Sequence, residues 1–206
     1  MGRVRGKAWM QEHVSDAYVK RARAEGMRSR AAYKLAQIAA RDRLLKPGMI
    51  VVDLGAAPGG WSQVAAERVA PHGRVIAVDL LDLPTLRGVT VIRGDVRDVG
   101  VLTQLEHALG GQKIDLVLSD MAPNLSGITS TDQARALELA ELALDFALKH
   151  LKPQGKFLVK SFQGAAFEGF LKNLHSRFRT VAVRKPEASR SRSSEVYLLA
   201  KALREA

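Results

Sequence analysis

Short apolar runs alternate with longer amphipathic stretches over most of this sequence. The run at residues 49–54 is nearly continuous in apolar side chains, which is typical of a strand buried on both faces of a sheet. Similar runs predict further strands at residues 74–79, 89–93, 114–119, 156–160, 180–184 and 195–200. Helical patterns lie between several of them, at residues 61–70, 99–109, 131–151 and 165–178. The alternation predicts right-handed β-α-β crossovers and an α/β fold, with helices on both faces of a mainly parallel sheet.

The end of the chain departs from this rhythm. The strands expected at residues 180–184 and 195–200 are joined by a loop alone, without a helix between them. Strands joined in this way should run antiparallel. We therefore expect a seven-stranded, mainly parallel sheet with an antiparallel last strand. This arrangement separates a methyltransferase-like sheet from that of a dinucleotide-binding dehydrogenase.

The N-terminal part has a different character. Residues 14–45 predict an amphipathic helix, and Pro47 and Gly48 interrupt the chain after it. A length of 206 residues suits one domain over residues 1–206, in which residues 1–46 form a basic helical extension and residues 47–201 form the core.

Basic residues are unevenly distributed along the chain. The formal net charge is +11, and residues 1–46 hold twelve Lys or Arg against four Asp or Glu, a net +8. Residues 177–194 carry a further net +5, whereas residues 47–176 carry a net −2. Segregated positive charge favours a polyanionic partner, because each contact to a phosphate releases condensed counterions. Generic solubility is the alternative explanation of this charge.

Composition excludes several classes of protein. The chain has no cysteine, so disulfides, thiolate zinc sites and cysteine nucleophiles are ruled out. Its five histidines are scattered without a pair at metal-ligand spacing, so we expect no metal. No apolar run approaches the roughly 18 residues of a membrane span, and the basic N-terminus leads into no apolar segment of a secretion signal. These features predict a soluble cytoplasmic protein.

A glycine-rich loop follows the first predicted strand. It spans residues 53–61, Asp-Leu-Gly-Ala-Ala-Pro-Gly-Gly-Trp, and its glycines allow the backbone to approach a ligand closely at the start of a helix. Ala57 stands where a dinucleotide-binding motif has its second glycine, and no Gly-Lys-Ser/Thr follows as in a P-loop. Asp53 suits a cationic or amino group better than a pyrophosphate. A turn without a ligand is the alternative.

Acidic residues follow the ends of the next two strands. Asp79 ends the second strand, where a carboxylate is placed to accept hydrogen bonds from ribose hydroxyls. Asp95 follows the third strand, where it is placed to meet the exocyclic amine of a purine. Either residue alone would be read as a helix cap. With the glycine loop they indicate an adenosine pocket with acidic neighbours, which fits S-adenosylmethionine better than NAD.

The fourth and fifth strands end in residues of opposite charge. Asp120 follows residues 114–119, and Lys160 ends an otherwise apolar strand. A lysine in such a position is costly unless it is paired, and Asp120 is its natural partner. A salt bridge that only stabilises this edge of the sheet is the structural alternative to a site.

These motifs together resemble the FtsJ-like family of ribose 2′-O-methyltransferases. The resemblance extends from about Trp9 to Ala200 and rests on residues 53–61, 79, 95, 119–124, 160–164, 184–186 and 194–197. It implies a Rossmann-like, S-adenosylmethionine-dependent methyltransferase fold. It also implies a Lys-Asp-Lys-Glu catalytic tetrad, for which this chain offers Lys34, Asp120, Lys160 and Glu195. The cofactor-binding residues that follow from the glycine loop, the strand ends and this resemblance are Asp53, Gly55, Gly59, Trp61, Asp79, Asp95 and Asp120.

The resemblance is strongest to the bacterial ribosomal RNA branch of the family. It implies methylation of a uridine ribose in the A-loop of 23S ribosomal RNA on the large ribosomal subunit, by a monomer, with Lys160 accepting the proton of the 2′-hydroxyl. Candidate RNA-binding residues are Arg28, Arg30, Arg184, Lys185, Arg190 and Arg192. The alternatives are another RNA target (tRNA or an mRNA cap), a non-catalytic ribosome-assembly factor, and a NAD-dependent oxidoreductase.

Overall fold

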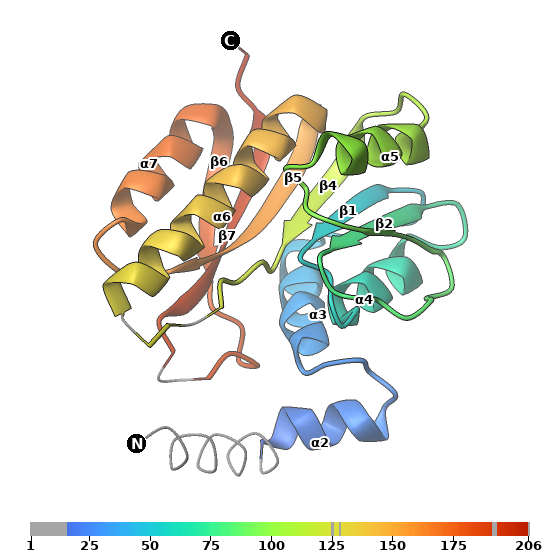
Figure 1. Ribbon diagram of the computed structural model, residues 1–206, viewed down its shortest axis with the longest axis horizontal. Coiled ribbons are helices and arrows are strands. Elements are labelled where there is room, and N and C mark those ends of the chain that lie inside the picture. Colours follow the sequence, from blue (N-terminus) through green and yellow to red (C-terminus); the bar gives the residue numbers. More distant parts are fainter. Residues whose placement is uncertain (1–15, 125, 128, 191–192, 206) are drawn as a thin grey trace.

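A seven-stranded sheet with helices on both faces forms the body of the molecule (Figure 1). The computed structural model describes residues 16–124, 126–127, 129–190 and 193–205. The strands are β1 (Ile50–Leu54), β2 (Arg74–Asp79), β3 (Val89–Arg93), β4 (Ile114–Ser119), β5 (Leu151–Phe162), β6 (Phe178–Arg184) and β7 (Glu195–Leu203). The helices are α2 (Ala17–Ala24), α3 (Ala31–Asp42), α4 (Gly60–Val69), α5 (Val99–Leu109), α6 (Thr129–His150) and α7 (Phe167–Arg177). None of the described helices is long and apolar enough to cross a membrane.

The strand order is β3-β2-β1-β4-β5-β7-β6. Neighbouring strands from β3 to β5 are parallel, and β7 lies antiparallel between β5 and β6. The predicted mainly parallel sheet with an antiparallel last strand is therefore confirmed. In this register Lys160 pairs with Tyr197 and Phe162 with Glu195, so the start of β7 lies beside the end of β5.

The alternation of side chains along the strands divides the core in two. On one face, Val52, Val117 and Val159 belong to the apolar cluster that includes α5, α6 and α7. On the other face, Val51 and Leu158 pack with α3 and α4. Because both faces of the central strands are covered, these strands are apolar at nearly every position, which explains the continuous runs in the sequence.

The expected single helix over residues 14–45 is wrong. The structure has two helices there, and the chain turns between them at Gly26, which has a positive φ of 68°. Beyond the turn, the backbone N–H of Arg28 donates to the side-chain oxygen of Gln63 on α4, 3.1 Å away. The break lets the chain pass over α4 before α3 starts. The amphipathic pattern continues through both helices, so periodicity alone does not reveal the break.

Candidate active site

Four charged side chains that the sequence analysis grouped as a tetrad meet at one edge of the sheet. Lys34 comes from α3, Asp120 follows β4, Lys160 lies near the end of β5 and Glu195 begins β7. They form two ion pairs: the Lys34 Nζ lies 2.6 Å from the Glu195 Oε1, and the Lys160 Nζ lies 3.2 Å from the Asp120 Oδ1. The Lys160 ammonium also donates to the backbone carbonyl of Asp120, at 2.6 Å. Topology thus brings together residues up to 161 positions apart in the chain.

Tyr197 joins the two ion pairs and was missed by the sequence analysis. Its hydroxyl lies 3.1 Å from the Asp120 Oδ1 and 3.2 Å from both the Glu195 Oε1 and the Lys34 Nζ. The ring is fully buried and packs 5.4 Å, centroid to centroid, from that of Trp61. Burial and the adjacent carboxylates Asp120 and Glu195 raise the pKa of Tyr197 well above its usual value, so the hydroxyl stays a donor. The period of two along the last strand, which puts Glu195 and Tyr197 on one face, is the signal that points to it.

Replacing Tyr197 by phenylalanine tests this link. The variant keeps the buried ring but loses the hydroxyl that connects Lys34, Asp120 and Glu195. For the methyl transfer that the family resemblance implies, we expect kcat to fall about 10-fold with KM for both substrates little changed, because the hydroxyl orients charged groups rather than binding substrate. Steady-state kinetics measure kcat and KM, and a thermal melt checks that the variant is folded. An unchanged kcat in a folded variant would contradict it.

Glu195 is held in its charged form. Burial raises the pKa of its carboxyl, but Lys34, Lys160 and the Ser189 hydroxyl together outweigh burial, and the pKa lies below its ordinary value. The Ser189 hydroxyl donates a further hydrogen bond to the Glu195 Oε1, at 3.1 Å. The Glu195 carboxylate fixes the position of the Lys34 ammonium at the site.

A large cavity of about 590 Å³ adjoins the tetrad at Asp120. It lies outside the carboxyl ends of β1, β2 and β4, where open α/β sheets bind their ligands. Four of the predicted cofactor residues line it: Gly55, Asp79, Asp95 and Asp120. The Asp79 carboxylate accepts hydrogen bonds from the backbone N–H groups of Ala57 and Leu81, both at 2.8 Å, and so shapes the loops on two sides of the cavity.

The other three predicted cofactor residues lie behind the cavity wall. Trp61 is buried, and its indole N–H donates to the Ala31 carbonyl at 2.8 Å, which ties α4 to α3. Gly59 caps the start of α4 with a φ of 102°. Asp53 is completely buried and accepts a hydrogen bond from the Ser62 hydroxyl at 2.6 Å. These residues support the loop at residues 53–61 instead of lining the large cavity.

Asp53 makes the stability of the protein depend on pH. Burial raises the pKa of Asp53 to about 7, against the opposing effect of the Ser62 hydrogen bond and with help from Asp120. The folded protein therefore keeps a proton that the unfolded chain releases near pH 4, so stability falls as pH rises from about 4 to 7. The free energy of unfolding of the wild-type protein should fall by about 3 kcal/mol between pH 5 and pH 8. Asp53→Asn cannot ionise at this position, so we expect this fall to be absent in the variant. Thermal melts of both proteins over this range measure the difference, and parallel curves would contradict it.

The predicted RNA-binding arginines have intramolecular partners. Arg184 forms a two-point ion pair with Asp42, whose pKa is lowered chiefly by these hydrogen bonds. Arg28 donates to the carbonyls of Pro84 and Thr85, both at 2.8 Å. Arg30 bonds to Asp16 and to the Ala188 carbonyl. Among the remaining predicted residues, the Lys185 Nζ donates to the Ser193 carbonyl at 2.7 Å, the Arg190 Nε lies 3.8 Å from Asp16, and Arg192 falls outside the described residues.

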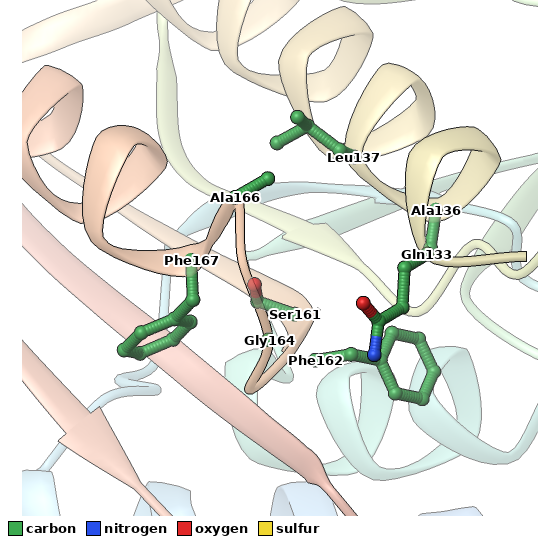
Figure 2. Close-up of a pocket in the computed structure, with 8 residues that line it drawn as sticks. All are labelled: Gln133, Ala136, Leu137, Ser161, Phe162, Gly164, Ala166 and Phe167. Atoms are coloured by element: carbon green, nitrogen blue, oxygen red, sulfur yellow. The ribbon is translucent and has the colours of Figure 1, made fainter. Parts of the chain in front are cut away.

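A second pocket lies between the start of α6 and the segment before α7 (Figure 2). Leu137 and Ala136 of α6 face Ala166 and Phe167 across it, and the Gln133 amide points towards Gly164. Its volume of about 20 Å³ has room for roughly one water molecule. The large cavity at Asp120 is therefore the better candidate for a cofactor. In the part of the chain that the structure describes, no three His, Asp or Glu side chains are grouped as metal ligands.

The strand order, with β7 between β5 and β6, and the cavity at the carboxyl ends of the parallel strands define a Rossmann-like methyltransferase. Residues 27–203 match the model of the FtsJ-like methyltransferase family, and the chain belongs to this family. It is 60% identical over 198 residues, 96% of this chain and 97% of the relative, to the ribosomal RNA large subunit methyltransferase E of Azoarcus sp. strain BH72.

Solved structures agree with this assignment. The crystal structure of a ribosomal RNA methyltransferase from Plasmodium falciparum is similar with a TM-score of 0.77 and 29% identity, over 85% of this chain and 98% of that one. A SAM-dependent O-methyltransferase from Thermotoga maritima shares the fold at a TM-score of 0.55 and 15% identity, over 84% of this chain and 66% of that one.

Proposed function

We propose that this methyltransferase transfers a methyl group from S-adenosylmethionine to the 2′-hydroxyl of a uridine ribose in the A-loop of 23S ribosomal RNA, on the large ribosomal subunit. The observation that carries the proposal is the position of Asp120, which pairs with Lys160 on one side and lines the large cavity on the other. The relative from Azoarcus, named for the large subunit, supports the choice of RNA. Such a substrate places the reaction in the cytoplasm.

The large cavity fits the cofactor by the chemistry of its walls. Asp79 and Asp95 offer carboxylates for ribose hydroxyls and an adenine amine, and the exposed side chains of Leu80 and Leu81 offer apolar surface beside them. The cofactor carries its methyl group on a sulfonium, which needs little activation before transfer. Asp120 supplies negative charge where the cavity meets the tetrad, which suits a positively charged methyl donor.

In the proposal, the tetrad supplies a group that can accept the proton of the ribose 2′-hydroxyl. A 2′-hydroxyl is only weakly acidic, so its proton must leave as the methyl group arrives. In the proposal, the neutral amine form of Lys160 accepts that proton and becomes an ammonium, and the Asp120 carbonyl and carboxylate fix the position of its nitrogen. Lys34, held by Glu195 and Tyr197, brings a second positive charge to the developing alkoxide. Holding the hydroxyl in line with the methyl group supplies much of the acceleration.

RNA contacts belong to the proposal as well. Lys185 and Arg190, in the loop between β6 and β7, and the exposed Lys20 and Arg23 of α2 lie on segments that adjoin the tetrad residues in the sequence and carry excess positive charge. We propose that they contact phosphates. Such contacts position an RNA without reading its sequence.

The direct test supplies labelled S-adenosylmethionine and large ribosomal subunits from cells that lack this methyltransferase, and maps the product nucleoside by mass spectrometry. We expect one 2′-O-methyluridine in the A-loop. Parallel reactions with protein-free 23S RNA, tRNA and capped mRNA test the alternative targets. Methylation of one of these in place of the subunit would change the assigned substrate, and cofactor binding without transfer to any RNA would support a binding role.

A further inference from the structure

The loop between β6 and β7 is fastened to the N-terminal helices by Arg30. This arginine precedes the first turn of α3, and its guanidinium donates to the Asp16 carboxylate ahead of α2 and to the Ala188 carbonyl in the loop. In Figure 1, α2 lies apart from the sheet, below α3, so this contact bridges two outlying segments. Its partners are separated from it by 14 and 158 positions in the chain.

The fastened loop leads directly to the tetrad. Ala188 is completely buried against Ala22 and Tyr33, and its N–H donates to the Gln37 Oε1 at 3.0 Å. The next residue, Ser189, is also buried and donates its hydroxyl to the Glu195 carboxylate. Arg30, the Ala188 carbonyl, the Ser189 hydroxyl and Glu195 therefore form one continuous series of contacts that ends on the partner of Lys34.

The environment of Arg30 differs from that of an arginine available to a phosphate. Only 16% of its side chain is exposed, and both terminal nitrogens of its guanidinium already have oxygen partners within the protein. Arg23, in the last turn of α2, is exposed. A phosphate could reach Arg30 only by displacing Asp16 or the Ala188 carbonyl, which would release the loop.

We propose that Arg30 is a positioning residue for the tetrad: it holds the loop at Ala188 so that Ser189 and Glu195 keep the Lys34 ammonium in place. The inference deepens the proposed function and rests on it, because it assigns Glu195 and Lys34 to the reaction. It replaces the expectation from sequence that Arg30 contacts RNA phosphates.

Kinetics of Arg30→Ala, Arg30→Lys and the control Arg23→Ala test the proposal. Arg30→Lys keeps the charge, but an ammonium does not reproduce the planar fork that binds two acceptors. We expect both Arg30 variants to lower kcat roughly 10- to 100-fold with the KM for ribosomal subunits within about 2-fold of wild type, whereas Arg23→Ala, at a proposed phosphate contact, should raise that KM and leave kcat unchanged. A phosphate contact at Arg30 would give a different result: Arg30→Ala would behave as Arg23→Ala does, with weaker RNA binding and unchanged kcat, and Arg30→Lys would be near normal. That result would overturn the proposal.

Two further measurements separate the steps. If Arg30 acts through Ser189, the effects of Arg30→Ala and Ser189→Ala on kcat will not add in the double variant, whereas additive effects would contradict a role of Arg30 through Ser189.

Hydrogen exchange on the protein alone should show faster exchange at the Ala188 and Ser189 amides in Arg30→Ala but not in Arg23→Ala. Unchanged exchange would contradict the proposal that Arg30 fixes the position of the loop at Ala188. Faster exchange in a protein whose wild type methylates no RNA would reject the proposed function and keep the structural role of Arg30.

Discussion

Replacing Lys160 by methionine is expected to reduce kcat for methyl transfer roughly 100- to 10,000-fold, the range over which a positioned proton acceptor accelerates a reaction. The methionine keeps most of the length and apolar volume of the lysine stem, and only 8% of the Lys160 side chain is exposed. What is lost is the nitrogen that Asp120 holds with its carbonyl and carboxylate. Transfer of label to the large subunit measures the rate, and calorimetry with S-adenosylhomocysteine measures binding to the cofactor cavity.

The control for this variant is Lys152→Met, on the same strand. Lys152 pairs with Asp115 at 2.7 Å, is about half exposed, and lies towards the other end of β5. Like Lys160→Met, the Lys152→Met substitution removes one positive charge and one ion pair, but it does not contact the tetrad. We therefore expect kcat to stay within about 2-fold of wild type. Lys160→Met loses the partner of Asp120, but the Tyr197 hydroxyl still reaches that carboxylate, so we expect a folded protein. A folded Lys160→Met with normal kcat would remove Lys160 from the mechanism.

The parts of this structure that sequence predicts are those governed by short-range patterns. Each of the seven strands overlaps a predicted run, and the signal is clearest in the central strands β1, β2 and β4, which are buried on both faces. Asp79 ends β2 and Asp95 follows β3, at an edge that the topology rules assign to ligands, and both line the large cavity. Lys34 is different: on its helix alone it reads as a solvated lysine, and only the family resemblance brings it to the site.

What sequence does not predict depends on contacts between distant segments. Nothing near Arg30 in the chain indicates that its partners are Asp16 and Ala188. The sequence likewise marks Arg184 as basic and does not show that Asp42 neutralises it. A count of charges treats every arginine as available to RNA, whereas several of them already form hydrogen bonds or ion pairs within the protein. Tyr197 is missed for the same reason, since its role depends on Lys34 and Asp120, which come from distant parts of the chain, as well as on Glu195 two residues away on the same strand.

Gly55→Ala is expected to weaken cofactor binding at least about 5-fold and to lower the activity with it. Gly55 has a φ of 76°, and a Cβ added there would lie 2.6 Å from the Met121 Cγ and 2.9 Å from the Met121 backbone N and Cα. Side-chain rotation cannot relieve a contact with backbone, so residues 120–122 must move. That movement displaces Asp120, the residue shared by the cavity and the tetrad. Overpacking of this kind costs about 1–3 kcal/mol, which corresponds to roughly 5- to 150-fold in binding if the cofactor-bound form bears it.

Gly110→Ala separates the clash from the cost of the backbone conformation. Gly110 also has a positive φ, 59°, but a Cβ there would meet no atom within 4 Å. Both variants carry the cost of an alanine in left-handed backbone, about 1 kcal/mol, and should lose similar stability from that source. Only Gly55→Ala should lose affinity for S-adenosylhomocysteine in calorimetry. Equal affinity in the two variants, with both folded, would show that the Gly55–Met121 approach does not shape the cofactor cavity.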